Sequence, residues 1–593
     1  MNETKKLDYS KYRNTPTAGK NILLIVGAVA AAVRILLFAA YLDSPLRYFH
    51  LVPGLDMQSL LRYGQWGENG VQPVFTLHRT LVAIVYYLNG GMHSVLALSV
   101  IQLAGGVATA MLSAYAALHL WGNRRLALLT GLIAALYAPA AMYELTMLQE
   151  SLLLLAFSAS FAGLLWAHKH RFACQYGLIL GVLLGLASIG RPTALLWVIL
   201  AIVWSAWVIF RRQKQQVFRV FWIVGGVIAV YLSVSVLNYR YNDRLSPFFS
   251  VLDYSASVNK LDENQAKNPA LVSAPIQLFK IGLKAVERLP KVFLAHEIPD
   301  NLNYYFIRDN FPELKLMIGP GLLIPFALAG LALILISGRF LRRDGVICIA
   351  IFALSLPICA NYPMGRYRLI LLLPFTLAAV ETARIALQKP RKLYLPLSLV
   401  LLLGAFLVNP FTRAKFYRSS DFVTWALALE SQAGGKMTPE SISALLEAYQ
   451  GSNNEKVAMN LLIRLITLGK FSEAQGLIND ALERNIGNPS LLHYYSALLH
   501  LEARDLKGTQ IELSKCDPAA LGEFTIKFYF LQGEVARISG RKTEAARLYQ
   551  KALNEPDAFG FRPQIERALS QLQESHSTRN SVKTKPTTVA PSK

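Results

Sequence analysis

The stretch that decides the fold runs from Asn21 to Leu42 and reads NILLIVGAVAAAVRILLFAAYL, with Arg34 as its one charged residue. About 20 predominantly apolar residues are enough for a helix to cross the hydrocarbon core of a membrane. The basic segment before the stretch is typical of a signal peptide, but the apolar run is too long for one and lacks a convincing small-residue cleavage site. We therefore expect a first transmembrane helix here.

The whole chain shares this apolar character. Hydrophobic residues make up 53% of its 593 residues and charged residues 16%, against about 25% charged residues in an average soluble protein. This composition argues against a soluble enzyme. The net charge of +23 calls for no nucleic-acid partner, because Lys and Arg of an apolar chain are commonly held at one membrane face. The four cysteines are too few and too scattered for a disulfide framework or a zinc site.

Ten further apolar runs follow the first. They lie near residues 93–120, 126–142, 149–167, 174–190, 193–210, 218–238, 317–337, 345–359, 368–387 and 393–411. The expected fold is therefore all-α: a polytopic transmembrane helical bundle of about eleven spans over residues 21–411, followed by a soluble helical domain.

Basic residues mark every second connection between the expected spans. With residues 1–20 in the cytoplasm, Arg124-Arg125, Arg211-Arg212 and Arg342-Arg343 all fall on the inner side, as the positive-inside rule requires. An odd number of spans then places everything after Pro410 on the extracytoplasmic face. Two long loops, near 43–92 and 239–319, also lie outside, and loops of this size are usually functional.

The C-terminal region has the spacing of a helical repeat. Small residues recur in Gly469-x-Phe471-x-x-Ala474 and again at Gly540 and Ala545, a separation close to two tetratricopeptide periods of about 34 residues each. We expect a tetratricopeptide-like domain at 412–574, with an unrelated helical bundle as the alternative. Residues 575–593 are rich in Ser, Thr, Lys and Pro and are expected to be disordered.

Three carboxylates near the outer ends of expected spans are candidate catalytic groups. Asp56 follows the first span, where it could act as a general base toward an acceptor hydroxyl or, alternatively, cap the helical run after it. Glu144 and Glu150 flank the short turn between the third and fourth spans. Carboxylates so close to hydrocarbon are costly unless partnered or hydrated, so they are functional candidates, with snorkelling into interfacial water as the alternative.

Three arginines lie outside against the positive-inside trend and are candidate substrate-binding residues. Arg191 lies between the fifth and sixth spans, and Arg366 and Arg368 lie in Gly365-Arg366-Tyr367-Arg368-Leu369 at the start of the tenth. A guanidinium fork suits phosphate oxygens, whereas lipid-headgroup contact is the alternative. Arg34, inside the first span, is expected to pair with a carboxylate of the bundle.

The second long outer loop contains His296-Glu297-Ile298-Pro299-Asp300-Asn301. His296 and Glu297 are candidate substrate-binding residues, with ordinary solvated loop side chains as the alternative. No Gly-rich phosphate loop, H-E-x-x-H site or G-x-S-x-G elbow occurs where it could work, which argues against an ATP-driven pump.

Taken in order, these features resemble a known family. An acidic residue after span one, a Glu opening span four, Gly-Arg-Pro between spans five and six, and Arg-Tyr-Arg-Leu before a late span are similar to the polytopic C-superfamily of glycosyltransferases. The likeness is to the branch of the protein O-mannosyltransferases and the lipid A aminoarabinose transferase, and it covers most of residues 20–411. Some bacterial members carry a C-terminal tetratricopeptide region, so the resemblance implies a bacterial inner-membrane protein of the cell envelope.

The resemblance implies transfer of a sugar from a polyprenyl-phosphate carrier to an acceptor on the outer face. Asp56 matches the family's first-loop acidic residue, the base or acceptor-orienting group, and Glu150 matches the acidic residue at the fourth span, with Glu144 nearby. Arg366 and Arg368, and then Arg191, match the basic residues for the carrier phosphate. The segment from His296 to Pro299 is similar to an outer-loop segment of the repeat-bearing members. The implied partners are the lipid-linked sugar, membrane lipids and an acceptor protein or glycan.

The chemistry can be stated without the family. A phosphate-linked sugar already carries a good leaving group, so the protein must bind the charge of the departing phosphate and activate an incoming hydroxyl. A divalent metal ion held by Asp56 with Glu150 or Glu297 could replace part of this. Two other functions stay open: a transporter or flippase of a lipid-linked sugar, which would place ionisable residues near the bilayer midplane, and a non-catalytic membrane scaffold that displays the repeats.

Overall fold

The structure is a computed structural model that describes residues 16–64, 76–212, 216–242, 245–247, 274–341, 344–360, 363–386, 391–408, 417–557 and 560–582. The chain divides into two compact units, Met1–Tyr417 and Arg418–Lys593, so the boundary falls a few residues after the expected one at 411/412. Within these described ranges the secondary structure is helical and no β-strand occurs. The expected all-α fold is confirmed.

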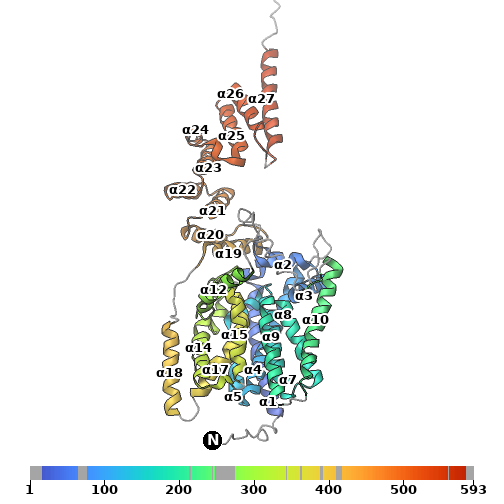
Figure 1. The fold of residues 1–593 in the computed structure, drawn as a ribbon. Coiled ribbons are helices and arrows are strands. Elements are labelled where there is room, and N and C mark those ends of the chain that lie inside the picture. Colours follow the sequence, from blue (N-terminus) through green and yellow to red (C-terminus); the bar gives the residue numbers. More distant parts are fainter. Residues whose placement is uncertain are drawn as a thin grey trace, which may run out of the picture. The chain divides into compact units, whose positions relative to one another are not determined.

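The first unit is a bundle of long helices (Figure 1). Those that correspond to expected spans are α1 (Pro16–Leu42), α4 (Gly91–Trp121), α5 (Arg124–Ala135), α6 (Ala138–Leu145), α7 (Glu150–Lys169), α8 (Cys174–Gly190), α9 (Leu195–Arg212), α10 (Arg219–Asn242), α14 (Pro320–Ile336), α15 (Gly345–Ala360), α17 (Leu372–Ala386) and α18 (Arg391–Val408).

Among the described residues, five helical segments are long and apolar enough to cross a membrane, and they correspond to α1, α4, α7, η3 (Pro192–Ala194) with α9, and α10. Shorter apolar helices occur at α8, α14, α15 and within α18. Large apolar side chains such as Ile35, Leu36 and Val203 lie exposed on the bundle surface, as expected where the surrounding solvent is lipid. The chain is therefore an integral membrane protein, while the exact number of spans and their orientation stay predictions.

Close helix packing in the bundle depends on small residues. A Cβ atom added to Gly181 of α8 would lie 2.1 Å from the carbonyl oxygen of Ile223 in α10. A Cβ at Gly330 of α14 would likewise meet the carbonyl of Ala378 in α17. Membrane helices gain stability from such close backbone approach, because the lipid removes most of the hydrophobic drive for association.

The third expected span is not continuous. Its two parts, α5 and α6, are separated at Leu136 and Tyr137, because Pro139 lacks an N–H group and its ring would clash with the preceding helical turn. The opened backbone pairs with the chain before α14: Ala138 N donates to Ile318 O at 2.9 Å, and Ile318 N donates to Leu136 O at 2.7 Å. The break and this pairing thereby fix the direction of α6 relative to α5.

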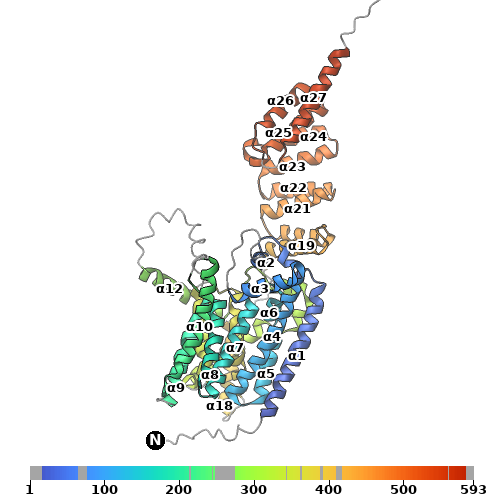
Figure 2. The same cartoon turned by 90° about the vertical axis from the view of Figure 1, so that its right-hand side faces the viewer.

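Helices outside the expected spans, most of them short, gather at one end of the bundle, called the site end below. They are η2 (Pro45–Leu51), α2 (Asp56–Gly64), α3 (Leu77–Asn89), η3 (Pro192–Ala194), α12 (Ala274–Val292), α13 (Tyr304–Asn310), η6 (Pro312–Leu316), α16 (Gly365–Arg368) and η8 (Leu369–Leu371); η7 (Arg339–Leu341) follows α14. Figures 1 and 2 show α2, α3 and α12 at this end. The short helices belong mainly to the two long loops that the sequence analysis singled out.

The second unit consists of antiparallel helix pairs (Figure 2). In chain order its helices are α19 (Ser419–Gln432), α20 (Pro439–Gln450), α21 (Glu455–Thr467), α22 (Phe471–Glu483), α23 (Pro489–Glu502), α24 (Leu506–Ser514), η9 (Pro518–Ala520), η10 (Gly522–Phe524), α25 (Thr525–Ile538), α26 (Lys542–Leu553) and α27 (Arg562–Val582). Ala474, Ala481, Ala545 and Ala552 are fully buried in two hydrophobic clusters. This placement is what tetratricopeptide packing requires, and the assignment to that repeat class stays a prediction.

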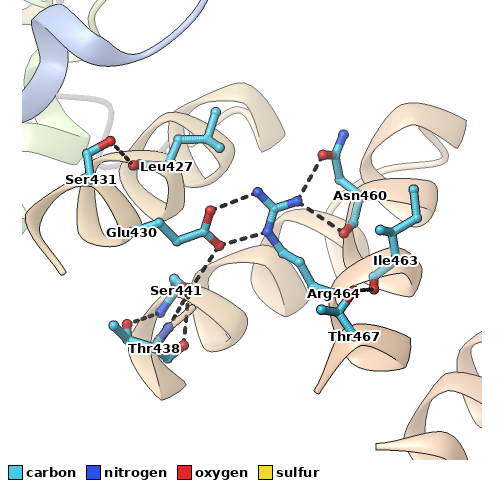
Figure 3. Close-up of polar contacts among 9 residues, drawn as sticks. All are labelled: Leu427, Glu430, Ser431, Thr438, Ser441, Asn460, Ile463, Arg464 and Thr467. Atoms are coloured by element: carbon cyan, nitrogen blue, oxygen red, sulfur yellow. Dashed lines mark hydrogen bonds and ion pairs between the residues drawn. The ribbon is translucent and has the colours of Figure 1, made fainter. Parts of the chain in front are cut away.

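A half-buried ion pair joins the first helices of this unit (Figure 3). Arg464 of α21 donates to both carboxylate oxygens of Glu430 in α19, at 2.7 and 2.8 Å, and Ser441 of α20 donates to the same carboxylate at 3.3 Å. Arg464 also donates to Asn460 O and Oδ1. Because every partner is hydrogen-bonded, the pair fixes how the three helices meet.

The expected disorder of residues 575–593 stays a prediction. The structure describes helical backbone of α27 as far as Val582. The helix continues because Pro563 stands at its start and no further proline occurs before Val582, so helical hydrogen bonds can persist into a polar segment. Residues 583–593 lie outside the described residues.

Candidate active site

Arg366 is the centre of a charged cluster at the site end. It belongs to the one-turn helix α16 that precedes η8 and α17. Its Nη1 donates to Asp56 Oδ2 at 2.5 Å, its Nε pairs with Asp300 Oδ2, and its Nη2 donates to Tyr367 Oη at 3.0 Å. Glu150 Oε1 lies 3.9 Å from Nε. Three segments distant in sequence, which carry Asp56, Glu150 and Asp300, thus converge on one guanidinium.

The electrostatics of this cluster keep Arg366 charged. Burial alone would lower its pKa, but the negative charge of Glu150, the Tyr367 hydroxyl and the hydrogen bond to Asp56 together raise it above the usual value. Asp56 and Asp300 differ in their surroundings: the side chain of Asp56 is 48% exposed and that of Asp300 14%. Arg366 is thus a permanent cation with one accessible and one buried carboxylate partner.

Glu150 and Arg191 form the deeper part of the site. The Glu150 side chain is 1% exposed, and Arg191 Nη1 lies 3.6 Å from its Oε1. The Arg191 guanidinium also stacks on the Tyr367 ring, 3.8 Å from the ring centroid. Neither Glu150 oxygen nor Arg191 Nη1 has a hydrogen-bond partner among the residues that the structure describes. Buried polar atoms without partners are uncommon in proteins and are a feature of functional sites.

Arg368 has surroundings unlike those of Arg366. Its Nη1 donates to the carbonyl oxygens of Lys291, Val292 and Leu294, and its Nη2 donates to His296 O at 2.6 Å and Glu297 Oε2 at 2.9 Å. The residue is 5% exposed. With these donors engaged by the protein itself, Arg368 fastens the end of α12 and the following loop to α16.

Glu297 is held by several partners at once. Besides Arg368, Tyr137 donates to Glu297 Oε1 at 3.3 Å, and the Glu297 N–H donates to the Tyr305 hydroxyl at 3.0 Å. A Cβ at Gly365 would lie 2.3 Å from Glu297 Oε2, so a larger residue there would force the Glu297 carboxylate to shift. Burial raises the pKa of Tyr305 to about 12, with further contributions from its neighbours, so this hydroxyl stays protonated.

His296 lies beside this group and is partly buried. Burial lowers the pKa of His296, and the positive charge of Arg368 acts in the same direction. Its backbone oxygen accepts a hydrogen bond from Arg368. The segment that contains His296 and Glu297 thus meets α16 directly, and it positions Asp300 against Arg366.

Glu144 is not among the residues gathered by Arg366. It pairs with Arg34 of α1 through two hydrogen bonds of 2.9 Å each, and Arg34 Nη1 also donates to Ala135 O at the end of α5. The expectation that Arg34 pairs with a carboxylate of the bundle is confirmed. The pair spans the break between α5 and α6, so it holds α6 in place beside Glu150.

The sequence-predicted site residues fall into three groups. One cluster contains Asp56, Glu150, Arg191 and Arg366. An adjacent group contains Glu297, His296 and Arg368, and Glu144 lies apart from both. Sequence reasoning gave no role to Asp300, Tyr367 or Tyr137. Asp300 and Tyr367 belong to motifs that the sequence analysis quoted, but the motifs did not indicate which residues these two side chains would contact. The position of Tyr137 depends on the break between α5 and α6, and Pro139 indicates this break in the sequence.

The donor set does not fit a divalent metal ion in this arrangement. No group of three or more His, Cys, Asp or Glu side chains suited to a metal occurs among the described residues. The carboxylates of Asp56 and Asp300 instead converge on the Arg366 guanidinium. The metal ion expected as an alternative stays a prediction, and no chemical step below depends on it.

Comparisons with known proteins give little. No family model matches the chain, and no curated protein matches it. Two solved structures of an oligosaccharyltransferase from Archaeoglobus fulgidus are similar at 15% and 14% identity, with TM-scores of 0.34 and 0.33. One holds an inhibitory peptide and a dolichol-phosphate, and the other a tethered acceptor peptide. The match covers 74% of this chain but 58% and 57% of theirs, and similarity this weak carries no argument.

Proposed function

We propose that this protein is an integral-membrane glycosyltransferase that moves a sugar from a polyprenyl-phosphate donor to an acceptor hydroxyl on the extracytoplasmic face. The observation that carries the proposal is the charged cluster at the site end. It combines an accessible carboxylate, Asp56, with two guanidinium groups, Arg366 and Arg191, around the buried Glu150.

The two guanidinium groups suit the carrier phosphate. A planar fork of N–H donors matches phosphate oxygens and forms charge-assisted hydrogen bonds with them. Arg191 Nη1 has no hydrogen-bond partner among the described residues, so it can bond to a ligand without first losing a bond within the protein. As negative charge develops on the leaving phosphate, these fixed cations stabilise the transition state more than the ground state.

In the proposed step, the acceptor oxygen forms a bond to the anomeric carbon of the sugar. The bond between that carbon and the phosphate oxygen breaks, and its electron pair stays on the phosphate. The hydroxyl proton goes to the carboxylate of Asp56, whose exposed side chain can reach an acceptor that arrives from water. Charge therefore balances between Asp56 and the arginine-bound phosphate.

The remaining residues support this site by position. Arg368 and Glu297 hold the loop that carries Asp300, with His296 in the same segment. Glu144 holds α6 through Arg34. These roles differ from direct contact with substrate, which the sequence had led us to expect for Arg368, Glu297, His296 and Glu144. The second unit recruits or orients the acceptor protein or glycan.

One observation bears on the transport alternative. The ion pair between Arg34 and Glu144 is buried inside the bundle, where transporters hold ionisable residues. Its partners are mutually satisfied by two hydrogen bonds, and Arg34 is also bonded to the backbone. An ion pair with these bonds is suited to holding helices together, and it offers no free charged group to a substrate that passes through the bundle.

The test compares wild type with Asp56→Asn and with the matched control Glu313→Gln, which changes the same charge on the η6 helix. Mass spectrometry of surface glycans and glycoproteins, together with immunoblots of membrane abundance, is the readout. We expect Asp56→Asn to abolish transfer at normal abundance and Glu313→Gln to retain it. Normal transfer by an abundant Asp56→Asn protein would refute the assignment of Asp56 as base.

A further inference from the structure

Each nitrogen of Arg366 lies against a group of the protein. Nη1 donates to Asp56, Nη2 donates to the Tyr367 hydroxyl, and Nε forms an ion pair with Asp300. Two of these groups are carboxylates, so a phosphate that binds Arg366 competes with them for one cation. Asp56, the proposed base, is itself one of them.

Asp300 is the more firmly held carboxylate. Its side chain is 14% exposed, and its N–H donates to Leu302 O at 3.3 Å. The preceding residues are tied to α16, because Gly365 N donates to Ile298 O at 2.9 Å and Arg368 grips His296 and Glu297. These bonds fix the backbone around Asp300.

Asp56 is the less firmly held one. Its side chain is 48% exposed, and it opens the short helix α2 just after Gly54, whose φ of +84° marks a turn. Water can hydrate the carboxylate of Asp56 when it leaves Arg366, because that side chain is half-exposed, whereas Asp300 is largely buried. Of the two carboxylates, Asp56 therefore exchanges at the lower cost.

On the basis of the proposed function, we infer that the carrier phosphate displaces Asp56 from Arg366, while Asp300 acts as a positioning residue that keeps Arg366 in place. Phosphate binding frees Asp56 Oδ2, the oxygen that accepts a hydrogen bond from Arg366. Both oxygens of the base are therefore open to the acceptor hydroxyl only when a donor is bound, and the donor binds before the acceptor reacts.

The experiment uses the purified full-length protein in phosphatidylglycerol nanodiscs, with undecaprenyl phosphate as the probe, so no sugar transfer is needed. Dissociation constants are measured for wild type, Asp56→Asn and Glu313→Gln. Removal of the competing carboxylate is expected to tighten binding about two- to fivefold in Asp56→Asn, with Glu313→Gln unchanged. Equal or weaker binding by Asp56→Asn would overturn the inference.

Carbodiimide footprinting of wild type gives a second readout. Undecaprenyl phosphate is expected to raise labelling of Asp56 and to leave that of Asp300 low. A rise at Asp300 instead of Asp56 would overturn the assignment of the fixed and exchanging partners. Strong labelling of Asp56 in phosphatidylglycerol alone, with no change on adding the carrier, would show that a lipid headgroup has already displaced it and would overturn the assignment to the carrier. If wild type shows no saturable binding of the carrier, the proposed function fails together with this inference; binding without displacement refutes the inference alone.

Discussion

The buried pair of Arg34 and Glu144 allows a sharp test of which carboxylates are structural. The side chains are 4% and 3% exposed and joined by two hydrogen bonds of 2.9 Å. Removing one partner of a buried ion pair leaves an uncompensated charge and costs about 3–5 kcal/mol. Arg34→Met and Glu144→Gln are each expected to destabilise the protein by this amount.

The double variant Arg34→Met/Glu144→Gln leaves no buried charge at this position. Its loss of stability is expected to be smaller than the sum of the two single losses by about 2–3 kcal/mol, since residues in direct contact couple strongly. The remaining loss comes from Ala135 O, which loses its donor.

Thermal unfolding of the purified variants, followed by intrinsic fluorescence, measures stability, and sugar transfer is measured on the same samples. We expect the double variant to regain much of the transfer activity that the single variants lose. A stable double variant without transfer would show that Glu144 takes part in the chemistry and would refute the structural interpretation. Single variants as stable as wild type would refute the buried pair itself.

Other predictions concern the site end. Gly365→Ala is expected to lower transfer at least tenfold, because its Cβ would lie 2.3 Å from the Glu297 carboxylate, whereas the control Gly404→Ala has open space around its Cβ and is expected to be active. Because burial lowers the pKa of His296 below 6.5 in the folded protein, protonation favours the unfolded state, so stability is expected to fall as the pH drops below about 6.5. The variant His296→Gln is expected to lose less stability in thermal scans at pH 7 and pH 5, and an equal loss would contradict this. Because the Arg366 guanidinium lies between the carboxylates, transfer is expected to persist in a chelator; full loss that Mg²⁺ or Mn²⁺ restores would contradict that view.

Much of the architecture could be predicted because its physics is local. A helix of about 20 apolar residues satisfies its own backbone hydrogen bonds, so each span is visible in the chain without knowledge of its neighbours. The exception is the run at 126–142, where composition indicated one span but Pro139 divides it into α5 and α6. Helix α27 reaches Val582 through a polar segment without proline, which composition alone did not predict as helix.

The site was predicted less completely. Asp56, Glu150, Arg191 and Arg366 stood out because charges are rare at the ends of apolar helices, and the structure brings these four together. What distinguishes Arg366 from its neighbour Arg368 could not be predicted. Two arginines in Arg-Tyr-Arg point to different surroundings, one toward carboxylates and the other toward the carbonyls after α12.

The sequence by itself determined that this protein is an all-α membrane protein with a second, helical unit, because hydropathy and periodicity are properties of single segments. Only the tertiary structure decided which charges act together. The pairing of Arg34 with Glu144, and the convergence of Asp56 and Asp300 on Arg366, join residues far apart along the chain. Such pairings depend on how helices pack and on where the chain is tied down, and neither is encoded in the residues next to the charge.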